Sequence, residues 1–128
     1  CWDAEETGLL GSQHWVRLPT VELPRVKLAL NLDMIGRLRN QEVTTMGWRS
    51  AAGLRPLMAA ANRRSRLEFR FDSHISADSD HHSFYAARIP VLHFDTGKHE
   101  DYHRPSDDVE KLNWTGLETI GTFLAELI

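Results

Sequence analysis

Alternating apolar side chains between residues 26 and 34 constrain the fold of this chain more than any other feature of its sequence. The apolar side chains stand at every second position, namely Val26, Leu28, Leu30, Leu32 and Met34. A period of two is typical of a β-strand, because successive side chains of a strand point to opposite faces. The pattern therefore predicts a strand over residues 26–34, ended by Gly36.

Further strand patterns alternate with helical patterns along the rest of the chain. We expect strands at residues 42–48, 67–71 and 90–95, and helices at residues 8–18, 51–67, 81–87 and 114–127. Pro56 is expected in the first turn of its helix, where a missing N–H costs little. This alternation predicts an α/β fold. We expect a single domain over residues 1–128, a three-layer sandwich of the phosphorylase/hydrolase type with helices on both faces of a mostly parallel or mixed sheet.

Composition excludes several classes of protein. The 128 residues carry a net charge of -3, which disfavours a nucleic-acid-binding protein because such proteins are usually basic. The single cysteine, Cys1, rules out an internal disulfide. No apolar run approaches the roughly 18 residues that a membrane-spanning helix needs. An ordinary globular domain remains.

Polar side chains with metal-binding chemistry stand near the predicted strand ends and in the loops between elements. Glu5 and Glu6 open the chain, Asp33 lies near the end of the strand at 26–34, and His103 lies in the loop after residues 90–95. Ligands of α/β sheets bind outside the carboxyl ends of the strands, so these segments could converge. Carboxylates and imidazole together suit zinc, and a free carboxylate beside a metal can act as a general base.

Four motifs carry a resemblance to a known family. They are EETGLLGS at residues 5–12, NLDMIG at 31–36, SDH at 79–81 followed by Phe84, Ile89-Pro90 and Thr96-Gly97, and DYHRPSD at 101–107. In this order, and over nearly the whole chain, they resemble the co-catalytic dinuclear-zinc aminopeptidases, peptidase family M28. The resemblance implies hydrolysis of N-terminal peptide bonds of peptides or proteins, with two Zn²⁺ ions in a complete site.

The resemblance also implies roles for individual residues. Glu5 would be the general base that activates the water, and Tyr102 would donate a hydrogen bond to the oxyanion. Glu6 and His103 would bind one zinc ion, and Asp33 the other. The family uses a further histidine and a bridging aspartate upstream of the Glu-Glu pair, and no histidine precedes Glu5 here.

Because two ligands are missing, the sequence is expected to be the C-terminal part of a longer enzyme, N-terminally truncated and with little or no activity alone. Asp3 is a poor substitute because we expect it to continue a strand, in which Cys1 would be buried. A truncated sheet leaves an exposed edge, so a homo-oligomer formed through that edge is expected. Many enzymes of the family are exported, which suits a periplasmic or secreted parent enzyme, while the sequence itself leaves the compartment open.

Several residues admit two interpretations. In the first interpretation, Asp80 and His81 line the substrate pocket. In the second, Asp80 or its neighbour Ser79 caps the following helix, and His81 is partly exposed. His93 and Asp95 share one face of a strand, and they either line the same cleft or serve only in the packing of the domain. His14, His74 and His99 are expected to be ordinary surface histidines.

Two other functions stay open. One is a glutaminyl-cyclase-like zinc transferase, against which the intact GLLGS stretch at residues 8–12 argues. The other is a non-catalytic binding or dimerisation domain derived from a peptidase, which the missing ligands favour and the retained site residues disfavour.

Overall fold

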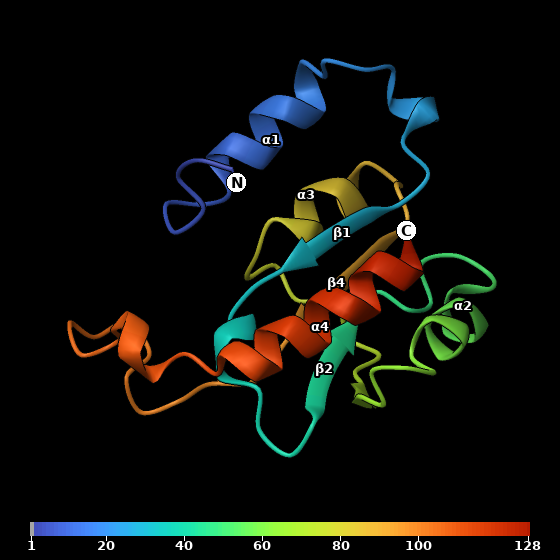
Figure 1. Ribbon diagram of the computed structural model, residues 1–128. Helices are drawn as coiled ribbons and strands as arrows, with labels where there is room; N and C mark the ends of the chain where they lie inside the picture. Colours follow the sequence, from blue (N-terminus) through green and yellow to red (C-terminus); the bar gives the residue numbers. More distant parts are fainter. Residues whose placement is uncertain (1) are drawn as a thin grey trace.

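The computed structural model describes residues 2–128, so the expectation for Cys1 lies outside the described residues. Its elements alternate as the sequence predicts (Figure 1). The α-helices and β-strands are α1 (Leu10–Arg17), β1 (Ala29–Leu32), β2 (Glu42–Met46), α2 (Leu54–Ala61), β3 (Glu68–Phe71), α3 (His81–Ala86), β4 (Val91–Asp95) and α4 (Trp114–Leu127). Three 3₁₀ turns lie between them, η1 (Leu23–Arg25), η2 (Ile35–Arg37) and η3 (Val109–Lys111).

The sheet is mixed, with strand order β1-β4-β2-β3. β1 runs parallel to β4 and β2 parallel to β3, while β2 and β4 pair antiparallel. The central strand β4 is buried from Val91 to Phe94, as expected for a strand covered on both faces. β1 and β3 form the two edges of the described sheet.

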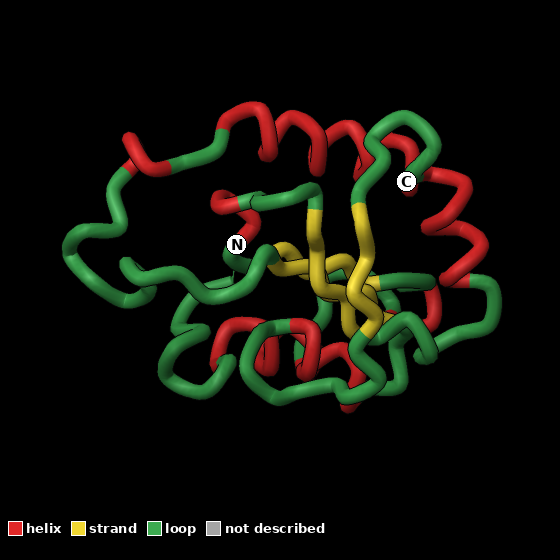
Figure 2. The backbone as a smooth tube through the Cα atoms, turned by 90° about the horizontal axis from the view of Figure 1, so that it is seen from below, coloured by secondary structure: helices red, strands yellow, loops and turns green. Residues whose placement is uncertain are grey.

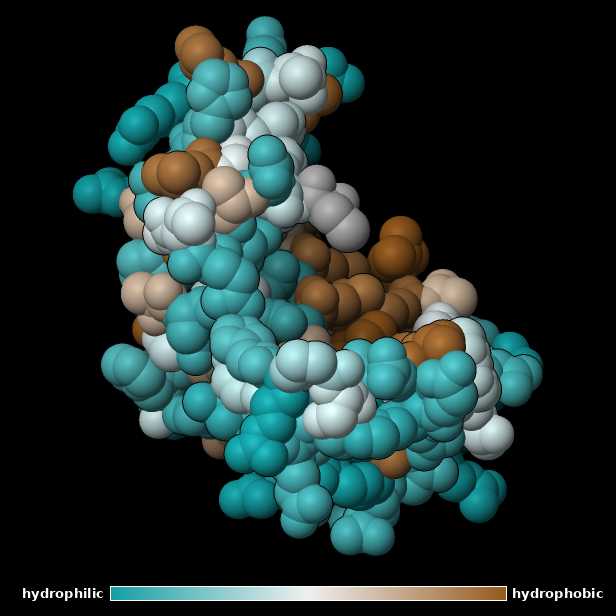
Figure 3. Space-filling model, turned by 90° about the vertical axis from the view of Figure 1, so that its left-hand side faces the viewer, coloured by the Kyte–Doolittle hydropathy of each residue, from teal (hydrophilic) through white to brown (hydrophobic). Residues whose placement is uncertain are grey.

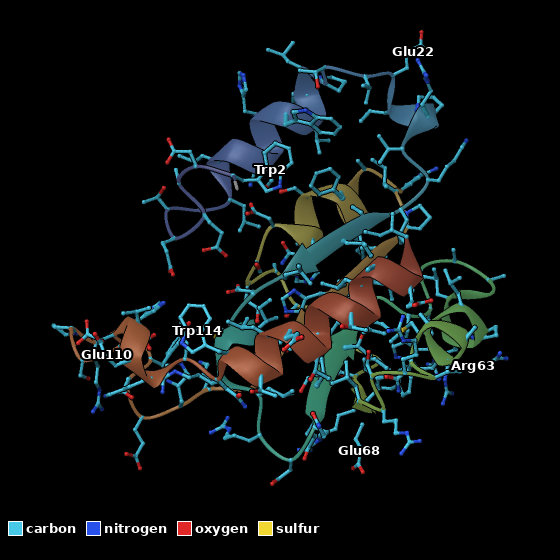
Figure 4. All side chains as sticks on the ribbon, in the orientation of Figure 1. Trp2, Glu22, Arg63, Glu68, Glu110 and Trp114 are labelled. Atoms are coloured by element: carbon cyan, nitrogen blue, oxygen red, sulfur yellow. The ribbon has the colours of Figure 1, made fainter. Side chains whose placement is uncertain are left out.

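Helices cover both faces of the sheet, which confirms the predicted α/β sandwich (Figure 2). On one face, α2 and α4 pack together over a core in which the Phe123 ring lies 5.0 Å from Phe69 and 5.5 Å from Phe94 between centroids. On the other face, α1 packs on α3. There the rings of Trp2, Trp15 and Phe84 lie 5.6–5.7 Å apart, and the labelled Trp2 points between these helices (Figure 4).

The strand predicted at residues 26–34 is shorter than its alternating pattern. Regular pairing begins at Ala29, whose amide donates to the carbonyl of Pro90 at 2.8 Å. Proline has no N–H to continue the ladder, so residues 26–28 stay outside the sheet. At its C-terminal end, the strand stops at Leu32, and the left-handed backbone of Met34 (φ 53°) then turns the chain away from the sheet.

Other elements also differ from prediction. The helix predicted at 51–67 covers only Leu54–Ala61, with Pro56 in its first turn as expected. It ends because the Asn62 side chain bonds both the amide and the carbonyl of Leu67, at 2.8 and 2.7 Å. The strand predicted at 42–48 ends at Met46. The strand expected through Asp3 is wrong, because residues 2–5 are irregular, residues 6–8 form a turn, and the Asp3 carboxylate accepts the Ala4 amide at 2.8 Å.

Asn113 is the N-cap of α4 and also ties the helix to the segment after β1. Its Oδ1 accepts the Gly116 amide at 2.8 Å, and its Nδ2 donates to the Leu38 carbonyl at 2.8 Å. We expect Asn113→Ala to lower the free energy of unfolding by about 1–2 kcal/mol in urea denaturation. Asn113→Asp keeps the cap acceptor and should lose less, so equal stability of both variants and the wild type would contradict this assignment.

One face of the molecule carries an exposed apolar region. Figure 3 shows hydrophobic side chains gathered in a hollow below the projecting α1 part of the chain. Leu32, at the end of edge strand β1, is 43% exposed. Within residues 2–128, no helix is long and apolar enough to cross a membrane.

Candidate functional site

Four segments far apart in the sequence form one pocket at the end of β1. They are the turn at residues 4–8, the segment 33–37 after β1, Asp78 before α3, and the loop 98–112 after β4. The pocket has a volume of about 370 Å³. Its lining includes all five residues to which the family resemblance assigns a role, namely Glu5, Glu6, Asp33, Tyr102 and His103.

The first segment is a turn that points two adjacent carboxylates in different directions. Ala4 has a left-handed backbone (φ 54°), and the Glu5 carbonyl accepts the amides of Gly8 and Leu9 at 3.1 and 2.9 Å. The Glu5 side chain lies near Ser79, whose hydroxyl lowers the pKa of the carboxyl group. The Glu6 carboxylate instead lies 2.8 Å from Nε2 of His103. The two glutamates can therefore do different chemistry.

The electrostatics of the pocket favour a basic carboxylate at Glu5. Burial raises the pKa of Glu5 above its ordinary value, and the negative charges of Glu6, Asp33 and Asp80 raise it further. The Ser79 hydroxyl acts in the opposite direction. A carboxylate with a raised pKa is a better proton acceptor, which is what general-base catalysis requires.

Asp33 is placed by the parallel pairing of β1 with β4. Its amide donates to the Phe94 carbonyl at 3.1 Å, one step beyond the last regular pair of Leu32 and Phe94. The left-handed turn at Met34 then takes the backbone away, leaving the carboxylate at the strand end. This position borders both the main pocket and a neighbouring one lined by His93 and Asp95.

Tyr102 and His103 stand together in the loop after β4. Their rings stack with centroids 4.0 Å apart, and the Lys98 ammonium lies 4.9 Å from the Tyr102 ring centroid. Burial and the charges of Glu6 and Asp33 raise the pKa of Tyr102 above its ordinary value of 10.0. The hydroxyl therefore keeps its proton at neutral pH and can donate a hydrogen bond.

Asp80 and His81 lie behind the pocket and are not among its lining residues. His81 is fully buried, and its ring stacks on His93 at 4.4 Å between centroids. Asp80 is the N-cap residue of α3, yet its side chain makes no capping bond, so the capping expectation is wrong. The Asp80 carboxylate acts on the site through its charge, which contributes to the raised pKa of Glu5.

The buried His81 makes stability depend on pH. Burial, reinforced by the charge of His93 and opposed by that of Asp78, lowers the pKa of His81 from 6.5 to about 4. The neutral form is the one that fits the fold, so its contribution is complete above pH 6.5 and is lost between pH 6.5 and about 4. The slope from this group is at most about 1.4 kcal/mol per pH unit.

This predicts a difference between the wild type and His81→Phe, which keeps an aromatic ring and cannot titrate. In urea unfolding at pH 7 and pH 4.5, the wild type should lose more free energy of unfolding than the variant. Carboxylate titration affects both proteins alike, so equal losses would show that His81 does not couple folding to protonation.

Several pocket residues escaped the sequence analysis. Asp78 lines both pockets, and only its position in the polar segment before the SDH motif could have indicated it. His99, expected to be an ordinary loop histidine, lines the main pocket, and its Nε2 lies 3.7 Å from a carboxylate oxygen of Asp107. Arg37 also borders the pocket. His93 and Asp95 line the neighbouring pocket, which favours the cleft interpretation over packing alone.

The donor set fits part of a zinc site. Glu6 and His103 offer an oxygen and a nitrogen ligand already in contact, and Asp33 offers a second carboxylate on the same pocket. Over residues 2–128, however, no group of three or more His, Cys, Asp or Glu side chains is gathered closely enough to hold a metal ion. These residues therefore supply some, not all, of the ligands that zinc requires.

The fold and the site together define a metallopeptidase-type α/β domain. The chain belongs to peptidase family M28, whose model matches residues 1–128. It is 30% identical over 135 residues to aminopeptidase YwaD of Bacillus subtilis (strain 168), covering 98% of this chain and 30% of that protein.

Solved structures of aminopeptidases share the fold. An aminopeptidase from Aneurinibacillus sp. strain AM-1 matches with TM-score 0.83 and 26% identity, over 98% of this chain and 31% of that one. BSAP, a zinc aminopeptidase from Bacillus subtilis, matches with TM-score 0.81 and 24% identity, over 99% of this chain and 33% of that one. The chain thus spans about a third of the length of these relatives.

Proposed function

We propose that this chain carries the general base, the tyrosine and three of the metal ligands of a zinc aminopeptidase that hydrolyses N-terminal peptide bonds. The convergence of Glu5, Glu6, Asp33, Tyr102 and His103 on one pocket is the observation that carries the proposal. Membership of peptidase family M28 and similarity to aminopeptidases support the reaction class.

Each residue has a chemical task in this proposal. Glu6 and His103 would hold one zinc ion and Asp33 a second, and zinc supplies a Lewis acid that polarises a carbonyl and acidifies water. Glu5 takes the proton of the attacking water and returns it to the leaving amine. Tyr102, which keeps its proton, donates a hydrogen bond to the carbonyl oxygen as negative charge develops there.

The charge of the pocket suits a free N-terminus. In its lining, five carboxylates outnumber the guanidinium of Arg37, so a protonated amino group is attracted more than a C-terminal carboxylate. The carboxylates are those of Glu5, Glu6, Asp33, Asp78 and Asp107. This favours an exopeptidase acting on the amino end of its substrate.

We further propose that the chain alone is a poor catalyst. A catalytic zinc ion normally has three protein ligands, whereas Glu6 and His103 give two and Asp33 gives one. A histidine and a bridging carboxylate from another polypeptide segment would complete the set. If no segment supplies them, the chain is better described as a non-catalytic binding domain.

Zinc stoichiometry and hydrolysis, measured together, test this proposal. The purified chain is compared with the same chain joined to the segment that precedes the matched region in the Bacillus subtilis relative. We expect weak zinc binding and no turnover of aminoacyl p-nitroanilides by the chain alone. The joined protein should bind two zinc ions and release nitroaniline, and both should decline in Asp33→Ala.

Two results would contradict the proposal. Tight binding of two zinc ions by the chain alone would show that its own residues complete the site. A joined protein that folds and binds zinc yet turns over no aminoacyl substrate would refute the aminopeptidase assignment.

Self-association through the β1 edge is part of the same proposal. The edge strand and the apolar hollow beside it offer unpaired backbone groups and hydrophobic side chains to a second copy (Figure 3). Sedimentation equilibrium of the chain should show a concentration-dependent dimer or larger species, and a monomer at all concentrations would argue against it.

A further inference from the structure

The loop that carries Tyr102 and His103 is attached mainly to the segment that follows Asp33. At its start, the Thr96 hydroxyl donates to the Met34 carbonyl at 2.5 Å, and Arg39 donates to the carbonyls of Thr96 and Lys98 at 3.1 Å. At its end, the Asn113 amide donates to the Gly36 carbonyl at 2.9 Å. Residues 34–39 therefore fix both ends of a loop that spans residues 96–113.

Arg37 holds the middle of the same loop. Its guanidinium lies 2.5 Å from Oδ1 of Asp107 and 3.4 Å from Oδ2 of Asp101, and its side chain is only 15% exposed. Asp101 and Asp107 stand on either side of Tyr102 and His103 in the DYHRPSD motif. The aspartates at the two ends of that motif, which have no role in the reaction proposed above, thus share one cation.

Other contacts of these aspartates stay within or beside the loop. Ser106 donates to Asp101 at 2.8 Å, and Lys111 pairs with the same carboxylate. The His99 ring lies 3.7 Å from Asp107. These contacts lie within the loop. Among the residues described, the bonds that join the middle of the loop to the segment after β1 are those of Arg37 with Asp101 and Asp107. A charge-assisted bond between a shielded guanidinium and carboxylates is stronger and more directional than a neutral one.

The loop needs such an attachment because it has little regular structure of its own. Residues 96–108 contain turns and irregular backbone only, and His103 has a left-handed backbone (φ 55°) that no helix or strand maintains. His103 is also 55% exposed, and its bond to Glu6 joins two solvent-accessible side chains. Such an exposed pair contributes little to holding a loop.

We propose that Arg37 is a positioning residue that keeps Tyr102 and His103 facing Glu6 and Asp33 by binding Asp101 and Asp107. The inference rests on the function proposed above for these residues. Arg37 itself takes no part in proton transfer or metal binding. It links the segment carrying one metal ligand, Asp33, to the loop carrying another, His103.

Hydrogen–deuterium exchange of the full 128-residue chain tests this proposal without any need for zinc or turnover. Arg37→Met removes the cation and keeps an unbranched side chain. We expect exchange of residues 98–108 to increase at least tenfold while β4 and α4 keep their protection. Arg37→Lys, which keeps the charge without the fork, should restore part of the protection. Arg104→Met, which removes an exposed arginine from the same loop, is the matched control and should have no effect.

Zinc affinity provides the second measurement. Loss of a group that orients a metal ligand typically lowers metal affinity about 10–100-fold. In the protein joined to the preceding segment, we expect the zinc affinity to fall by this factor in Arg37→Met and to stay unchanged in Arg104→Met. A charge exchange, Arg37→Asp with Asp107→Arg, should recover part of the loss.

The two proposals fail in different ways. If Arg37→Met exchanges like the wild type, the positioning role is wrong. The role is also wrong if Arg37→Met and Arg37→Lys both loosen β4 and α4 as much as the loop, because Arg37 would then stabilise the fold in general. If the loop loosens selectively and the protein joined to the preceding segment binds no zinc, Arg37 positions the loop and the metallopeptidase function is what fails.

Discussion

Replacing Glu5 with glutamine should lower kcat by about 10²–10⁴-fold in the chain joined to the preceding segment of its Bacillus subtilis relative, with zinc stoichiometry unchanged. Glutamine keeps the size of the side chain, but it cannot accept a proton. The raised pKa of Glu5 suits it to the role of base. The neighbouring Glu6 contacts His103 and is assigned to the metal, so it cannot replace Glu5 as the base. Steady-state hydrolysis of an aminoacyl p-nitroanilide, with zinc measured in the same samples, is the test.

Two controls sharpen this prediction. Glu6→Gln should lower zinc affinity and turnover together, because Glu6 is assigned as a ligand. In the unsubstituted protein, kcat should fall as pH drops through the pKa of Glu5, which lies above that of an ordinary carboxyl group. A Glu5→Gln protein that retains wild-type kcat would assign the base to another group.

Replacing Phe123 with alanine should cost about 3–5 kcal/mol of unfolding free energy, a large fraction of the roughly 5–15 kcal/mol that stabilises a domain of this size. Phe123 is 1% exposed, and its ring contacts those of Phe69 and Phe94. Alanine would leave a cavity beside Phe69 of β3 and Phe94 of β4. Urea denaturation followed by circular dichroism measures the loss.

The matched control is an aromatic residue at the other end of the same helix. Trp114 is 64% exposed, so Trp114→Ala should change the free energy of unfolding by no more than about 0.5 kcal/mol (Figure 4). If Phe123→Ala proves as stable as Trp114→Ala, then α4 does not close the core on this face of the sheet.

The helix α4 and the strand β4 could be predicted almost to the residue. The apolar residues of α4 recur at helical spacing, and its observed bounds, Trp114–Leu127, coincide with the prediction. β4 is a short apolar run, and the only difference is that Pro90 stays outside it. Both elements are central to the fold, so local pattern and tertiary environment agree.

The strand β1 shows where local pattern is insufficient. Its alternation extends to Val26, yet pairing starts at Ala29 because Pro90, directly before its described neighbour β4, has no N–H to continue the ladder. A strand ends where its partner ends, and that partner lies about sixty residues away along the chain. The turn at Asp3 and the early end of α2 were not predicted, because side-chain bonds to the backbone, such as those of Asn62, end an element without changing its hydrophobic pattern.

By itself, the sequence predicted an α/β domain, because hydrophobic periodicity is a local property. Its motifs, through their resemblance to peptidase family M28, indicated the five residues of the proposed chemistry. Only the tertiary structure decided that β2 and β4 run antiparallel, that Asp78 and His99 join the pocket, and that His81 lies buried behind it. It also decided that Arg37 reaches Asp101 and Asp107 across more than sixty residues of sequence. Such contacts depend on how loops return to a sheet edge, and loop paths are set by long-range packing and ion pairs that leave no periodic signal in the sequence.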